Sequence, residues 1–269
     1  MPTSDAIESR FHAATRFARE AGDFTLKRFH SKAYGAETKR DGTVVTLADR
    51  EAEQLLRDRI KEAFPGDGVL GEEFGETKGD SGFRWVLDPI DGTASFVHGV
   101  PLYGTLVAVE TLEGGPRSVV GVIHMPALGE TVAAAEGFGC LHAPGGGKIG
   151  RKAEVSRTTS LRDATMVTTA VDYFAKDGRE SLYLDLTRQF KYTRGWSDCY
   201  AHVLVATGRA DVCIEPSVNP WDVAPMTVIM REAGGRYTSW DGVETAHTKD
   251  GVASNGHLHE DVLKLLKSR

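Results

Sequence analysis

The chain has 269 residues, of which 41% are hydrophobic and 26% are charged. This length can bury a sizeable core, as one large domain or as two packed lobes. The 38 acidic residues outnumber the 32 lysines and arginines, giving a formal net charge of -6. This balance argues against a nucleic-acid-binding scaffold, which normally presents a basic face.

Cysteine spacing and apolar runs narrow the class of protein further. Cys140, Cys199 and Cys213 are odd in number and lack Cys-x-x-Cys spacing, so they indicate neither a disulfide framework nor a zinc site. The charged residues Asp5 and Glu8 lie where a secretory signal would be apolar. No apolar run is long enough to span a bilayer. We therefore expect a cytoplasmic protein with neither a nucleic-acid nor a membrane partner.

Two helices are predicted in the first quarter of the chain. Apolar residues recur at helical spacing over residues 4–30 and again over 48–64, and a turn is expected at 39–42. Asp49 falls in the first turn of the second helix, where the helix dipole favours a carboxylate. That structural role alone would explain Asp49.

A short apolar run, Trp85–Leu87, predicts a buried strand. Pro89 should end this strand at about Asp88, because proline cannot donate to a sheet ladder. Asp88 and Asp91 would then lie where the chain turns sharply, and they repel each other unless a cation lies between them. Magnesium favours such oxygen ligands, which can include the carbonyl group of Ile90. Asp-Pro and Asp-Gly are also common turn dipeptides, so this stretch alone leaves a plain turn equally open.

The rest of the chain divides into a meander and a mixed α/β region. Strands are predicted at 102–111, 118–125 and 130–136, and the glycine-rich stretch Pro144–Lys148 is expected to be a loop. Strands and helices then alternate, which indicates a mixed α/β lobe. The predicted strands are 164–169, 192–194 and 210–215, and the predicted helices are 179–189, 199–207, 222–233 and 258–266. We expect lobes at 1–150 and 151–269, packed as one unit.

Five histidines show no useful metal spacing. His257 and His259 lie two residues apart near the end of the chain, and we expect both on the surface. His98, His124 and His202 have no partner by spacing, so ordinary packing is the better interpretation of each.

Several acidic motifs together resemble the signatures of the inositol monophosphatase family of magnesium-dependent phosphatases. They occur in the family's order and at fitting separations, and the resemblance covers nearly the whole chain. The motifs are Thr43–Asp49, Gly71–Glu73, Asp88–Thr93, Trp221–Ala224 and Arg231–Gly235. The resemblance implies an alternating α-β-α-β-α sandwich, often dimeric, so a homodimer is expected.

The resemblance also implies roles for individual residues. Asp49 and Thr93 would position and deprotonate the attacking water, and the amides of Gly92 and Thr93 would bind phosphate. Two or three magnesium ions would be bound, and lithium is expected to inhibit the enzyme. Their ligands would be Glu72, Asp88, the carbonyl of Ile90, Asp91 and Asp222. An N-terminal helix position would by itself account for Asp222.

Two stretches depart from the common family pattern. Ser95 stands where the family commonly has asparagine, and residues 194–201 replace a stretch of small residues. The latter resembles the histidinol-phosphate phosphatase branch, which implies hydrolysis of a small phosphomonoester, L-histidinol phosphate. Arg194, Asp198 and Glu215 would then bind the substrate, the two acids facing its cationic groups. The alternatives are an inositol-1-phosphatase, another sugar or nucleotide phosphatase of the same fold, and a metal-binding protein without catalysis.

Overall fold

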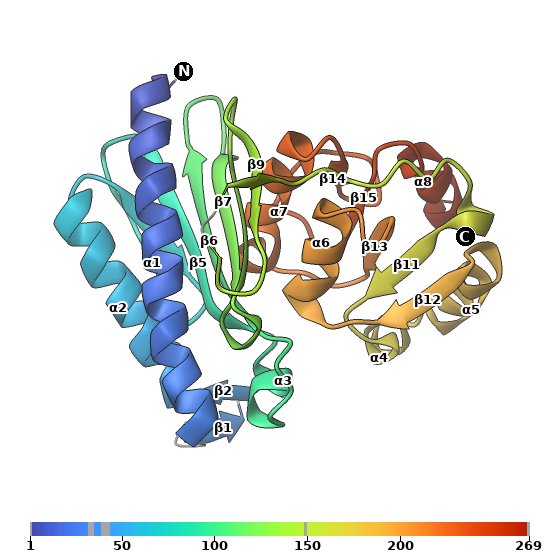
Figure 1. Ribbon diagram of the computed structural model, residues 1–269, viewed down its shortest axis with the longest axis horizontal. Helices are drawn as coiled ribbons and strands as arrows, with labels where there is room; N and C mark the ends of the chain where they lie inside the picture. Colours follow the sequence, from blue (N-terminus) through green and yellow to red (C-terminus); the bar gives the residue numbers. More distant parts are fainter. Residues whose placement is uncertain (1, 32–34, 39–43, 148–149, 268–269) are drawn as a thin grey trace.

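The computed structural model describes residues 2–31, 35–38, 44–147 and 150–267. They form alternating layers of helix and sheet, in the order α-β-α-β-α (Figure 1). This architecture confirms the predicted layered sandwich. The turn predicted at 39–42 and Lys148 lie outside the described residues. No described helix combines the length and the apolarity needed to cross a membrane.

Two amphipathic helices form the first outer layer. α1 spans Ser4–Ser31 and α2 spans Leu47–Ala63, close to the predicted ranges. Their apolar faces pack on one side of a large sheet, around the fully buried Trp85. The Trp85 indole N–H donates to Asp67 over 2.8 Å, and Arg10 of α1 forms a 2.7 Å ion pair with the same carboxylate.

The large sheet has eight strands in the order β10-β9-β8-β7-β6-β5-β3-β4. Neighbouring strands are antiparallel except β3 and β5, which are parallel, so the predicted meander is confirmed. The strands are β3 (Gly68–Gly71), β4 (Gly75–Thr77), β5 (Phe83–Asp91), β6 (Gly104–Thr111), β7 (Arg117–Met125), β8 (Glu130–Ala135), β9 (Gly139–Ala143) and β10 (Arg151–Lys152). A smaller hairpin pairs β1 (Ala36–Thr38) with β2 (Val44–Thr46).

The prediction that β5 stops at about Asp88 is wrong, because the strand runs on to Asp91. A β-bulge makes this possible, since the register with β6 shifts between Asp88 and Asp91. Pro89 lies inside the bulge, where the strand needs no N–H donor for a hydrogen bond to β6. Its carbonyl group is satisfied by the Thr105 hydroxyl, which donates to it over 2.9 Å.

Two buried helices separate the sheets. α6 (Asp198–Ala206) and α7 (Pro220–Glu232) share one apolar cluster with the inner faces of both sheets. Because both helices are covered on several sides, they are apolar almost all round. α7 comes late in the chain but packs on β6 and β7 of the first sheet. The division at residue 150 stays a prediction.

The second sheet has five strands in the order β12-β11-β13-β15-β14, and three helices cover its outer face. The strands are β11 (Thr165–Thr168), β12 (Tyr192–Gly195), β13 (Val212–Glu215), β14 (Arg236–Thr238) and β15 (Gly251–Ser254), and the helices are α4 (Val171–Lys176), α5 (Glu180–Gln189) and α8 (His259–Lys267). The short helix α3 (Thr93–Val97) follows β5.

The surface prediction for His259 is wrong, whereas His257 is exposed as expected. The His259 side chain is fully buried. Its ring nitrogens tolerate this burial because each has a hydroxyl group as a hydrogen-bond partner. Nε2 lies 2.9 Å from Thr238 Oγ1, and Nδ1 lies 2.8 Å from Ser254 Oγ. Burial lowers the pKa of His259 to about 4.

Candidate metal and substrate site

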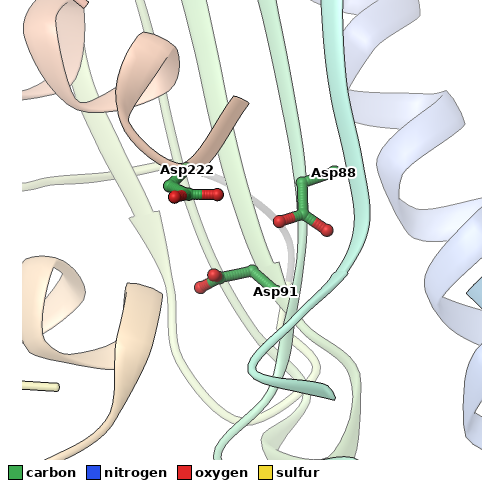
Figure 2. A group of neighbouring side chains, drawn as sticks. All are labelled: Asp88, Asp91 and Asp222. Carbon is green, nitrogen blue, oxygen red and sulfur yellow. The ribbon is translucent and has the colours of Figure 1, made fainter. Parts of the chain in front are cut away.

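Three carboxylates converge at the end of β5 and the start of α7 (Figure 2). Each of Asp88, Asp91 and Asp222 offers one oxygen, and these oxygens lie within 4.8 Å of one another. In a regular strand, side chains three residues apart point to opposite faces. The bulge between Asp88 and Asp91 adds one residue to β5 and so turns both carboxylates to the same side.

Asp222 reaches the group from the first turn of α7. Asn219 is the N-cap residue of this helix, and its backbone N–H donates to Asp222 Oδ2 over 2.7 Å. The carboxylate therefore takes part in a capping box and also points at the two acids of β5. The role expected for an acid at a helix start and the proposed metal-binding role coincide.

The negative charges of the three carboxylates are not neutralised by basic side chains nearby in the described ranges. Burial, and then the neighbouring acids, raise the pKa of Asp88 and Asp91 well above the usual range. Burial also raises the pKa of Asp222 to about 7, and the charge of Glu72 adds to this shift. Lys176 alone among the described lysines and arginines lines the surrounding cavity, and it pairs with Asp172 at 2.9 Å.

This donor set fits a hard divalent cation. All the side-chain donors are carboxylate oxygens, which magnesium prefers, and a dication between them would relieve their repulsion. Glu72 and Ile90 line the same cavity, although Glu72 is not one of the three carboxylates that meet within 4.8 Å.

Glu53 of α2 holds the loop that carries Glu72. Its buried carboxylate accepts hydrogen bonds from the backbone N–H groups of Glu73 (2.7 Å) and Phe74 (3.2 Å), and it pairs with Arg57. Gly71 leaves room for this carboxylate, because a Cβ there would overlap it. Glu53 was not predicted from the sequence, because it looks like an ordinary helix residue that pairs with a partner four positions later.

Thr93 and Asp49 meet beside the carboxylates. The Thr93 hydroxyl lies 3.4 Å from Asp49 Oδ1 and 3.1 Å from the Ile90 carbonyl oxygen. Asp49 Oδ2 accepts hydrogen bonds from the backbone N–H of Thr46 (2.8 Å) and from its hydroxyl (2.5 Å). Burial raises the pKa of Asp49 to about 7, which is suited to taking up a proton near neutral pH.

The other predicted site residues fall into two groups. Gly92, Asp198 and Glu215 line the same cavity, which has a volume of about 560 Å³. Arg194 does not line it, since its side chain is exposed on β12 and donates to the Thr193 carbonyl group.

Glu215 is buried at the end of β13, and the cavity reaches it. Its Oε1 accepts a 2.7 Å hydrogen bond from the backbone N–H of Thr169, and the Cys213 thiol lies 3.3 Å from the same oxygen. Burial raises the pKa of Glu215 to about 8. The Glu215 side chain is therefore not a solvated end of a strand.

Some lining residues were missed from the sequence. Tyr173 and Lys176 come from α4, a six-residue helix too short to show a periodic pattern. Cys199 contributes its backbone, since its N–H donates to Asp91 Oδ2 over 2.6 Å. Only the unusual composition of residues 194–201 gave a signal for this segment.

Comparison with known proteins agrees with this geometry. The profile of the inositol monophosphatase family matches residues 7–269. The chain belongs to the inositol monophosphatase family.

Relatives in this family include two named histidinol-phosphatases. The protein from Streptomyces coelicolor is 40% identical over 246 residues, which is 91% of this chain and 92% of the relative. The protein from Mycobacterium tuberculosis is 40% identical over 255 residues, covering 95% and 96% of the two chains. The solved structure of an inositol monophosphatase (IMPase) from Thermotoga maritima matches with a TM-score of 0.83 at 30% identity, covering 96% of each chain.

Proposed function

We propose that this member of the inositol monophosphatase family is a magnesium-dependent phosphomonoesterase that hydrolyses L-histidinol phosphate to L-histidinol and phosphate. One observation carries the choice of substrate: Asp198 and Glu215 add two carboxylates to the cavity that also holds the acidic cluster. An ammonium group and a protonatable imidazole give these carboxylates partners, whereas inositol offers only neutral hydroxyls. The 40% identity to two named histidinol-phosphatases supports the same choice.

In this proposal magnesium is held by Asp88, Asp91 and Asp222, with Glu72 and the Ile90 carbonyl group completing the set. When bound, magnesium neutralises the phosphate charge and acidifies a water molecule. A cation held by these acids would direct the phosphate of the substrate to the part of the cavity that they line.

The protein groups then supply orientation and proton transfer. The Thr93 hydroxyl orients the attacking water and passes the proton of this water toward Asp49, whose Oδ1 lies 3.4 Å away. The backbone N–H groups of Gly92 and Thr93, at the start of α3, bind a phosphate oxygen. Asp198 and Glu215, which line the same cavity, hold the cationic groups of the alcohol. Arg194 lies outside the cavity and has no part in this mechanism.

Phosphate release tests the proposal directly. L-Histidinol phosphate, inositol 1-phosphate and glycerol 2-phosphate are compared in magnesium and in excess chelator. We expect the highest kcat/KM for histidinol phosphate and no turnover in chelator. A preference for inositol 1-phosphate would favour the alternative substrate, and no phosphate release from any monoester would favour a non-catalytic metal-binding protein.

Two variants test the carboxylates. Asp198→Asn and Glu215→Gln should each raise KM for histidinol phosphate about ten-fold or more and change KM for glycerol 2-phosphate little, because charge-assisted hydrogen bonds are lost. Asp261→Asn, on the exposed face of α8, is the matched control and should change neither value. Equal effects on the two substrates would contradict this assignment.

We further propose a cytoplasmic homodimer, inhibited by lithium, with two or three magnesium ions in each subunit. Sedimentation equilibrium tests the dimer, lithium titration tests the inhibition, and metal analysis of the dialysed protein tests the number of magnesium ions.

A further inference from the structure

The two stretches that depart from the common family pattern meet in the structure. Ser95 of α3 and Ser197, just before α6, are 102 residues apart, yet their Oγ atoms lie 2.9 Å from each other. Ser197 Oγ also donates to Asp198 Oδ2. A serine hydroxyl has one proton. When Asp198 is ionised, the Ser197 hydroxyl donates this proton to a hydrogen bond with the carboxylate, so Ser95 is the donor to Ser197. The three side chains form a hydrogen-bond chain that ends on Asp198.

The backbone of this segment is strained. Ser197 has φ of 48° and Asp198 has φ of 42°, and no other non-glycine residue in the described part of the chain has a positive φ. Such conformations persist only where surrounding contacts hold them. Here the Ser95 hydroxyl holds one side of the segment, and the bond from the Cys199 N–H to Asp91 holds the other.

These contacts place the Asp198 carboxylate against Gly92. A Cβ on Gly92 would lie 2.8 Å from Asp198 Oδ2, so the absence of a side chain there makes room for the acid. The Ser197 hydroxyl satisfies Oδ2, whereas Oδ1 has no hydrogen-bond donor in the described ranges. One oxygen is therefore fixed and the other is available to a ligand in the cavity.

We propose that Ser95 and Ser197 are positioning residues that determine specificity, because they hold Asp198 so that its free oxygen meets a cationic group of the substrate. This inference rests on the proposed function and deepens it. Neither serine touches the reacting phosphate in this proposal; both act through Asp198. Ser95 and the segment that contains Ser197 each supply a part of the same hydrogen-bond chain.

The test compares hydroxyl loss with hydroxyl retention at position 95. Ser95→Ala should raise KM for histidinol phosphate about three- to ten-fold, the effect of losing one hydrogen bond, with kcat for glycerol 2-phosphate unchanged. Ser95→Thr keeps the hydroxyl and should restore most of the lost affinity. Ser181→Ala, at an exposed site on α5, is the control for serine replacement. A Ser95→Ala protein with unchanged KM for histidinol phosphate overturns the proposal.

A double-mutant cycle separates positioning from general packing. If Ser95 acts through Asp198, Ser95→Ala should have no further effect on KM in an Asp198→Asn protein. Additive effects, or equal KM changes for histidinol phosphate and glycerol 2-phosphate, would show that Ser95 acts elsewhere. If the unmodified enzyme does not hydrolyse histidinol phosphate at all, the proposed function fails instead, and the two failures are thus distinguishable.

Discussion

Replacing Asp222 with asparagine should stabilise the metal-free protein, although it removes a proposed metal ligand. Two carboxylates whose oxygens lie within 4.8 Å of each other repel by at least about 3 kcal/mol at an effective dielectric constant of about 20. The pKa of Asp222, raised from 3.8 to about 7, gives a similar cost, about 4 kcal/mol, for ionising it at pH 8. An asparagine at position 222 can still accept a hydrogen bond from the Asn219 N–H. This bond is weaker, because the acceptor is no longer charged. The net gain expected in the free energy of unfolding is about 2 kcal/mol.

The gain in the free energy of unfolding should be larger at high pH than at low pH. Folded Asp222 binds its proton more tightly than the unfolded side chain, so its contribution is most favourable below about pH 4 and is lost as pH rises toward 7. Urea unfolding in chelator should therefore show Asp222→Asn more stable than the unmodified protein at pH 8 and nearly equal to it at pH 5.

Magnesium should reverse the order, because only the unmodified protein keeps the full ligand set. The matched control is Asp67→Asn, since Asp67 is paired with Arg10 and bonded by Trp85. That variant should lose stability at both pH values, with or without magnesium. If Asp222→Asn is destabilising in chelator at pH 8, the three acids do not repel one another as the geometry requires.

Three further outcomes are expected. Thr93→Ala should lower kcat by about two to four orders of magnitude with magnesium affinity intact by calorimetry; loss of magnesium binding would make Thr93 structural. Glu53→Gln weakens the hydrogen bonds that hold the loop of Glu72. The magnesium concentration for half-maximal activity should therefore rise about ten-fold. An unchanged value would show that this loop does not depend on Glu53. The pKa of His259 is lowered to about 4, so its stabilising contribution is complete above about pH 6.5 and is lost as pH falls toward 4, by about 3 kcal/mol. His259→Gln should flatten the loss of stability that urea unfolding measures between pH 6.5 and 4, and an unchanged pH dependence would contradict this assignment.

The sequence predicted the long helices and the acid motifs well, because both depend on local patterns. The apolar spacing over residues 4–30 placed α1 within one residue at each end. The end of β5 was misjudged because Pro89 was weighed as part of a regular ladder, whereas a bulge against β6 accommodates it. β15 was missed because Gly251–Ser254 has small residues, and its burial comes from neighbouring strands.

In the candidate site, too, residues in local motifs were predicted, whereas features that depend on contacts distant in the sequence were not. Asp88, Asp91 and Asp222 were found from their motifs, and the structure brings them together. The burial of His259 and Glu215 could not be predicted, because each depends on partners that are distant in the sequence. The positive φ of Ser197 likewise depends on a contact with Ser95, which no local pattern indicates.

The late position of α7 in the chain has a consequence for synthesis. The first sheet, with β5 and its two aspartates, leaves the ribosome well before Asp222 does. A nascent chain that ends before α7 would carry the Asp88 and Asp91 carboxylates without their third partner, and one face of the first sheet would lack its covering helix. In the proposed mechanism the set of metal ligands is complete only after Asp222 has been made, so the enzyme would become active only once its two sheets have docked around α7.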